Sequence, residues 1–80
     1  MGNRLKELII QSGLKQYRIA DMVGISGNSL SSYIMGIRKP KFDTAKKIAE
    51  ILAKYLDREV ESIFFDIYNL NYDKHMINKH

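Results

Sequence analysis

Residues 14–36 read LKQYRIADMVGISGNSLSSYIMG, and this is the most informative stretch of the sequence. Two short segments with helical spacing of apolar residues are separated only by Gly24, Ile25 and Ser26. Glycine adopts the positive φ that so tight a turn needs, and Ile25 is placed to fill the angle between the helices. Ser26 is a favoured residue type for the N-cap of the second helix. Two helices joined by a three- or four-residue turn that contains glycine form a helix-turn-helix unit.

The spacing of apolar residues outside this stretch predicts three further helices and no strand. Leu5, Leu8 and Ile9 lie at i, i+3 and i+4, the pattern of an amphipathic helix, and Asn3 is a suitable N-cap. We therefore expect an all-α domain. Its five helices are predicted over residues 3–12, 16–23, 27–35 and 42–56, and from residue 57 or 58 onward. Apolar stripes are expected from Leu30, Tyr33, Ile34 and Ile37 in the third helix, from Phe42, Ala45, Ile48, Ala49, Leu52 and Leu56 in the fourth, and from Val60, Ile63, Phe64, Ile67 and Tyr68 in the fifth.

The composition leaves little room for catalysis or cofactors. The 80-residue chain contains no cysteine, and its only histidines, His75 and His80, lie in the last six residues. No pair of carboxylates, Ser-His-Asp set or glycine-rich phosphate loop is present, so we expect no enzyme, no metal and no cofactor. No apolar run approaches the roughly 18 residues of a spanning helix, and no secretory signal begins the chain. We therefore expect a cytoplasmic protein.

Charge is distributed unevenly along the chain. The whole chain carries +4, but residues 1–56 hold ten Lys or Arg and four Asp or Glu, whereas residues 57–80 hold three and five. The first part therefore carries +6 and the second −2. A basic surface of this kind suits a polyanion such as nucleic acid.

The outward face of the third helix is polar and carries no charge. A helical wheel places Asn28, Ser32 and Met35 opposite the apolar stripe, and no Asp, Glu, Lys or Arg occurs between Met22 and Ile37. Short polar side chains permit close approach to a groove, where Asn can bond adenine and Ser can bond several bases. A polar face that is merely tolerated is the alternative. The cations that flank this region suit phosphate contacts; they are Lys15, Arg18, Arg38, Lys39 and Lys41.

Residues 14–36 resemble, without a gap, the lambda repressor/Cro-like (XRE-type) helix-turn-helix family. That family commonly reads Leu-Ser-Gln-x-x-Leu-Ala-x-x-x-Gly-Val-Ser-x-x-x-Ile-Ser-x-x-Glu-x-Gly. The similarity continues through Arg38-Lys39-Pro40, through residues 44–49, and into Ile63-Phe64, and so covers about residues 3–65. The resemblance implies a five-helix lambda repressor-like DNA-binding domain, with the helix-turn-helix at the second and third helices.

By position, the resemblance also implies roles for particular residues. Gln16 would bond a DNA phosphate at the start of the second helix. Members of the family usually bind palindromic operators as two-fold dimers, with half-sites about one helical turn apart. The residues implied to read bases are Gly27, Asn28, Ser29 and Ser32, and those expected at phosphates are Gln16, Lys15, Arg18, Ser31, Arg38, Lys39 and Lys41.

The chain departs from the family pattern at several positions. Lys15 and Lys41 replace residues that usually cap the second and fourth helices, each at a cost of about 1 kcal/mol. Ile9 and Ile34 replace the Arg and Glu that often form a buried ion pair. Because both members are exchanged together, we predict that the two isoleucines touch. Gly27 replaces a longer, often polar residue, which removes one potential base contact.

The sequence assigns residues 1–65 to the DNA-binding domain and residues 66–80 to a C-terminal extension. The extension would continue the fifth helix, and residues 73–80 would fray. Apolar residues near this boundary suggest either a homodimer contact or a tail that folds back on its own core. The candidates for the dimer contact are Phe65, Ile67, Tyr68 and Leu70.

These observations favour a sequence-specific transcriptional regulator that binds double-stranded DNA. We expect a repressor of the compact phage or mobile-element type, homodimeric at least on DNA. The alternative is an antitoxin-like or adaptor protein that acts through protein–protein contacts of the fifth helix and tail. The apolar tail favours that alternative, and the uncharged polar face of the third helix disfavours it.

Overall fold

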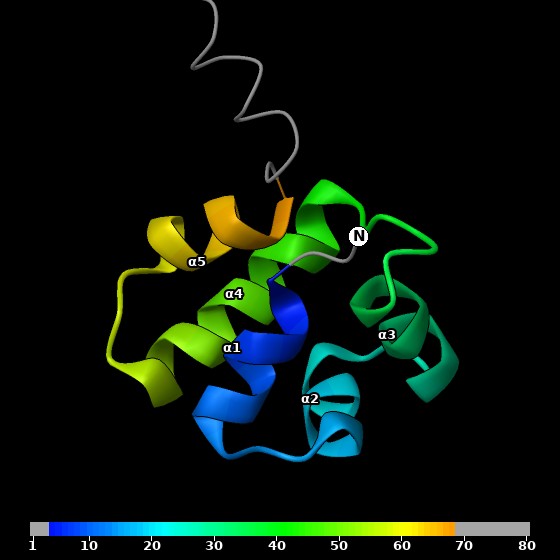
Figure 1. The fold of residues 1–80 in the computed structure, drawn as a ribbon, viewed down its shortest axis with the longest axis horizontal. Coiled ribbons are helices and arrows are strands. Elements are labelled where there is room, and N and C mark those ends of the chain that lie inside the picture. Colours follow the sequence, from blue (N-terminus) through cyan, green and yellow to red (C-terminus); the bar gives the residue numbers. More distant parts are fainter. Residues whose placement is uncertain (1–3, 69–80) are drawn as a thin grey trace, which may run out of the picture.

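The computed structural model describes residues 4–68, and within them every regular element is a helix (Figure 1). Helix α4 runs through the middle, with α1, α2 and α5 packed against it, while α3 packs against α2 and α1. The all-α prediction is confirmed. The helices are α1 (Leu5–Ser12), α2 (Gln16–Val23), α3 (Gly27–Ile34), α4 (Phe42–Leu56) and α5 (Val60–Tyr68).

The core consists of one side of every helix. Its buried residues are all apolar, and each fully buried Leu or Ile contributes about 1.5–3 kcal/mol relative to an exposed one. The predicted stripes of α1, α2 and α5 supply buried residues, and α4 supplies the longest row. The large side chains that are fully buried are Leu5, Leu8, Ile19, Leu30, Ile48, Leu52 and Ile63.

The end of α3 corrects one prediction about the core. Gly36 has φ +78°, and the N–H groups of Gly36 and Ile37 donate to the carbonyls of Tyr33 (3.2 Å) and Ser32 (3.0 Å). This left-handed turn closes α3 after Ile34 and redirects the chain. Ile37, predicted to extend the apolar stripe, is therefore 68% exposed.

Two helix starts also differ from the prediction. Helix α1 begins at Leu5 with Arg4 at its N-cap position, and the predicted cap Asn3 lies outside the described residues. Helix α5 begins at Val60 and not at residue 57 or 58. Asp57 takes a left-handed conformation (φ 56°) after α4, so the chain must turn before a new helix can start.

Helix α5 is part of the same core as the helix-turn-helix. It runs through the predicted boundary at residue 65, and Ile67 is only 3% exposed. Tyr68 is half-buried, and its ring stacks on that of Phe64 at 5.1 Å between centroids. The structure thus places these two dimer candidates against their own chain. Phe65 is 44% exposed, whereas Leu70 lies outside the described residues.

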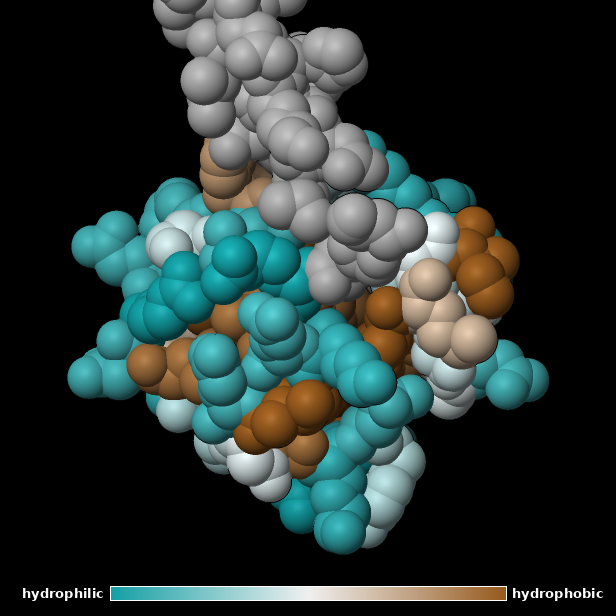
Figure 2. All heavy atoms as spheres, in the orientation of Figure 1, coloured by the Kyte–Doolittle hydropathy of each residue, from teal (hydrophilic) through white to brown (hydrophobic). Residues whose placement is uncertain are grey.

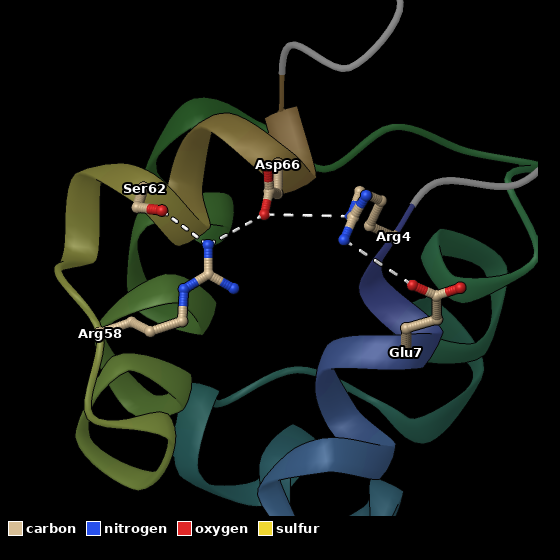
Figure 3. A network of polar contacts seen from close by, with 5 residues as sticks. All are labelled: Arg4, Glu7, Arg58, Ser62 and Asp66. Atoms are coloured by element: carbon tan, nitrogen blue, oxygen red, sulfur yellow. Dashed lines mark hydrogen bonds and ion pairs between the residues drawn. The ribbon is translucent and has the colours of Figure 1, made fainter.

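A polar network joins the start of α1 to α5 (Figure 3). Asp66 Oδ2 lies 3.2 Å from the guanidinium of Arg58 and 4.0 Å from that of Arg4. Arg58 also donates to Ser62 Oγ at 2.6 Å, and Arg4 lies 3.9 Å from Glu7. Exposed pairs of this kind contribute about 0–1 kcal/mol each. The network therefore links the start of α1 to α5 but adds little to the free energy of unfolding.

The predicted contact between Ile9 and Ile34 can be tested by restoring an ion pair at these positions. Ile9 is buried in α1, Ile34 packs half-buried against the core, and α1 contacts α3. We expect Ile34→Glu alone to lower the free energy of unfolding by about 1–3 kcal/mol, because the carboxylate loses solvent without gaining a partner.

Adding Ile9→Arg to that variant is expected to recover at least about 1 kcal/mol relative to the sum of the two single changes. Urea unfolding of the wild type, both single variants and the double variant measures this coupling. If the two changes add to within about 0.5 kcal/mol, the side chains are not in contact.

Candidate nucleic-acid interface

The turn between α2 and α3 has the geometry that the sequence predicts. Gly24 has φ +88°, and the N–H groups of Gly24 and Ile25 both donate to the carbonyl of Ala20, at 2.9 and 3.0 Å. The Ile25 side chain packs half-buried against the core. Ser26 caps α3, since its Oγ accepts from the Ser29 N–H at 3.0 Å. The predicted Ser26 cap is confirmed, and Ile25 is half-buried, as expected of a residue that fills the angle between the helices.

The outward side of α3 presents polar groups without charge. Gly27 and Asn28 are exposed, and the three serines are half-buried. The amide of Asn28 is free of hydrogen bonds to the described residues, so both its donor and its acceptor are available. The hydroxyls of two serines are partly engaged inside the helix. The Ser29 hydroxyl accepts from Ser26 at 3.1 Å, and the Ser31 hydroxyl donates to the sulfur of Met35 at 3.7 Å.

At the N-terminus of α3, Gly27 presents no side chain. A Cβ placed there would meet nothing within 4 Å, so the position is open and not a packing requirement. Its φ is also ordinary, since the positive values belong to the three turn glycines. A surface brought against this end of α3 can therefore approach its backbone closely.

Two helices next to α3 begin without a side-chain cap. Lys15 and Lys41 occupy the N-cap positions of α2 and α4 in extended conformation, and neither donates or accepts a capping bond. The first N–H groups of each helix remain unpaired by side chains and lie at the positive end of the helix dipole. Gln16, at the start of α2, is exposed. Each of these ends combines a lysine with free N–H groups, which suits a phosphate oxygen.

The remaining flanking cations are also exposed. Arg18 lies in the first turn of α2, and Arg38 and Lys39 lie in the connection between α3 and α4. The guanidinium carbon of Arg38 is 5.6 Å from the centroid of the Tyr33 ring, and Lys39 Nζ is 5.0 Å from that of Tyr68. Along the chain, exposed cations therefore precede α3 on α2 and follow it in the α3–α4 connection.

Apolar surface accompanies these polar groups. Figure 2 shows hydrophobic surface at the side of the molecule where α3 and the following connection lie. Met35 and Ile37 are the large exposed apolar residues of this part. Sequence reasoning missed Ile37 as a surface residue. Gly36 already signalled a helix stop, and ending the helical wheel there would have excluded Ile37 from the core.

No helix formed by residues 4–68 is long and apolar enough to cross a membrane. Within the same residues, no cluster of three or more His, Cys, Asp or Glu side chains could hold a metal ion. The exposed residues of α3 offer hydrogen-bonding groups, and the exposed cations before and after α3 offer positive charge.

Comparison with known protein families agrees with this geometry. A family model described as helix-turn-helix matches residues 5–58, from the start of α1 to just beyond α4. Comparison with curated proteins and with solved structures finds no match. The matched stretch is more than half of the chain and includes the α2–turn–α3 unit. This chain therefore belongs to the lambda repressor-like (XRE-type) helix-turn-helix family of DNA-binding regulators.

Proposed function

We propose that this protein is a sequence-specific transcriptional repressor that inserts α3 into the major groove of double-stranded DNA. The observation that carries the proposal is the charge pattern around α3. Its outward side is uncharged and polar, and exposed cations lie on the elements before and after it. Flanking phosphate contacts position a protein on DNA, whereas central polar groups read the bases.

Asn28 is the main base-reading residue in this proposal. Its exposed amide has a free donor and a free acceptor, which is the pair needed to bond adenine N6 and N7. Ser29 and Ser32 contribute single hydroxyls on neighbouring turns. Gly27 contributes close backbone approach and no side-chain contact, because it has no side chain to offer.

Phosphate contacts come from both flanks of α3. On one side, Lys15, Gln16 and Arg18 surround the uncapped start of α2. On the other side, the α3–α4 connection supplies the remaining contacts. The weak hydrogen bond from Ser31 to Met35 can be exchanged for one to a phosphate. The contacts on this second side are Ser31, Arg38, Lys39 and Lys41.

The proposal includes a two-fold dimer on a palindromic operator, in a cytoplasmic regulator without catalytic activity. One exposed aromatic residue on α5, Phe65, is the described candidate for the contact between two copies. The competing proposal is an antitoxin-like or adaptor protein that uses α5 for a protein partner. The same exposed Phe65 is what favours it, and the charge pattern around α3 is what disfavours it.

Removing the base-reading groups is the direct test. A binding site is first obtained by in vitro selection from random duplexes with the wild-type protein. On that site we expect Asn28→Ala and Ser32→Ala each to weaken binding, by about 1–3 kcal/mol for a bidentate contact and less for a hydroxyl. A repeated selection should also show relaxed preference at the contacted positions.

Gln11→Ala is the matched control, because Gln11 is an exposed amide at the end of α1. It should bind like the wild type. The proposed mode of reading fails if Asn28→Ala and Ser32→Ala retain both the affinity and the sequence preference of the wild type.

Restoring a helix cap separates folding from phosphate binding. Lys41→Ser is expected to raise the free energy of unfolding by about 0.5–1 kcal/mol, because Ser can cap α4 in the extended conformation that Lys41 already has. The same change should weaken DNA binding and reduce the slope of log K against log salt by about 1. Thermal unfolding and salt-dependent titrations measure the two effects.

Lys46→Ser removes an equally exposed lysine from inside α4, where no cap can form. It should not stabilise the fold. An unchanged salt slope for Lys41→Ser would remove Lys41 from the phosphate contacts.

The dimer is tested at Phe65. We expect Phe65→Glu to leave the free energy of unfolding within about 0.5 kcal/mol of the wild type, because the side chain is nearly half exposed. It should nevertheless shift the protein–DNA complex from two copies per site to one. Native mass spectrometry of the complex measures this number. Ile10→Glu, at an exposed apolar residue of α1, is the control.

A wild-type complex with a single copy per site would refute the dimer. If the protein prefers no DNA sequence, and if Phe65→Glu abolishes its binding to another protein, the adaptor role is favoured.

A further inference from the structure

The connection between α3 and α4 is anchored at both ends. At its start, the N–H groups of Ile37 and Arg38 both donate to the carbonyl of Ser32, at 3.0 and 3.3 Å. Near its end, Pro40 is buried and has a restricted φ. The backbone is therefore well held, and the main freedom left in this connection belongs to its long cationic side chains.

Two consecutive cations of this connection lie over aromatic rings from two different helices. Arg38 lies over Tyr33 of α3, a residue that is only 6% exposed. Lys39 lies over Tyr68, the last residue of α5, with Nζ 5.0 Å from the ring centroid. Distances below about 6 Å are those of attractive cation–π contacts.

The ring of Tyr68 is itself fixed by its neighbours. It stacks on Phe64, with 5.1 Å between centroids and 19° between planes. It also meets Phe42, the first residue of α4, edge to face at 6.0 Å and 88°. Residues of α4 and α5 thus set the position of the ring that Lys39 contacts.

We propose that Tyr68 is a positioning residue for DNA binding, through which α5 orders Lys39 before DNA arrives. This inference rests on the proposed function and adds to it a role for a helix that lies outside the helix-turn-helix. The ring face attracts the ammonium group but leaves its N–H donors able to bond a phosphate oxygen. Fewer side-chain conformations are then lost on binding, which raises the affinity.

A double-mutant cycle between Tyr68 and Lys39 tests the proposal on the selected DNA site. We expect Tyr68→Leu to weaken binding about 2–5-fold, because the Lys39 side chain must then be ordered when DNA binds. Tyr68→Phe keeps the ring and should bind like the wild type. In the Lys39→Gln background, Tyr68→Leu should cause no further loss.

Tyr55→Leu is the control, because Tyr55 is an exposed tyrosine of α4 that faces a groove with Met22, Ile51 and Lys54, away from Lys39. It should leave the affinity unchanged. The NMR spectrum of the free chain supplies a readout that needs no DNA. The ε-methylene protons of Lys39 should be shifted upfield by the ring in the wild type and in Tyr68→Phe, and not in Tyr68→Leu.

Two results would overturn the proposal. One is a Tyr68→Leu variant with wild-type affinity. The other is an equal loss in the Lys39→Gln background, which would show that Tyr68 acts on the fold as a whole. A wild-type chain that selects no DNA site is a different result, because it refutes the proposed function itself.

Discussion

The fold depends on one apolar surface, the buried row of α4. Ala45, Ile48, Ala49 and Leu52 are fully buried, and α1, α2 and α5 pack around this helix. The two alanines let neighbouring helices approach closely, while Ile48 and Leu52 fill the space between them. Helix α3 is held differently, because it packs against α2 and α1 through Leu30 and Tyr33. Its opposite side is therefore left toward solvent, which is the condition for a helix that enters a groove.

The N-termini of α2, α3 and α4 differ in whether a side chain caps them. The turn into α3 is capped by Ser26, whereas the starts of α2 and α4 carry lysines without capping bonds. The cap stabilises the first turn of α3 and so holds the backbone of Asn28 in place. The uncapped ends of α2 and α4 keep free N–H groups and add a cation to each. The same residue choices that forgo a side-chain cap thus place positive charge at two helix ends.

Much of the fold follows from the sequence, because local spacing determines it. The bounds of α2 and α4, the Gly24 turn and the Ser26 cap are all local features. The errors at Ile37 and at the start of α5 have a shared cause. In both places a left-handed residue interrupts the helical path. Gly36 ends the turn after α3 before Ile37, and Asp57 ends α4, so α5 begins only at Val60.

The spacing of apolar residues does not predict which segments far apart in the chain come into contact. Sequence spacing places Ile67 on an apolar stripe, but it does not say whether the stripe meets its own core or a second copy. The pairing of Lys39 with Tyr68 is of the same kind, since it depends on how α4 returns the chain to α5. The flanking cations could be predicted as exposed, whereas the rings that lie beneath Arg38 and Lys39 could not.

Helix α5 therefore cannot be treated as an appendage to the DNA-binding unit. Ile63 and Ile67 complete the core on one side of the helix, and Tyr68 reaches Lys39 of the α3–α4 connection. A domain of this size has few residues to spare, so single side chains serve both packing and presentation of charge. Tyr33 of α3 also has two sets of contacts, because its ring is buried in the core and lies beneath Arg38. Because the ring that packs α5 against α4 also lies beneath Lys39, a change in how α5 docks on α4 also changes the surroundings of Lys39.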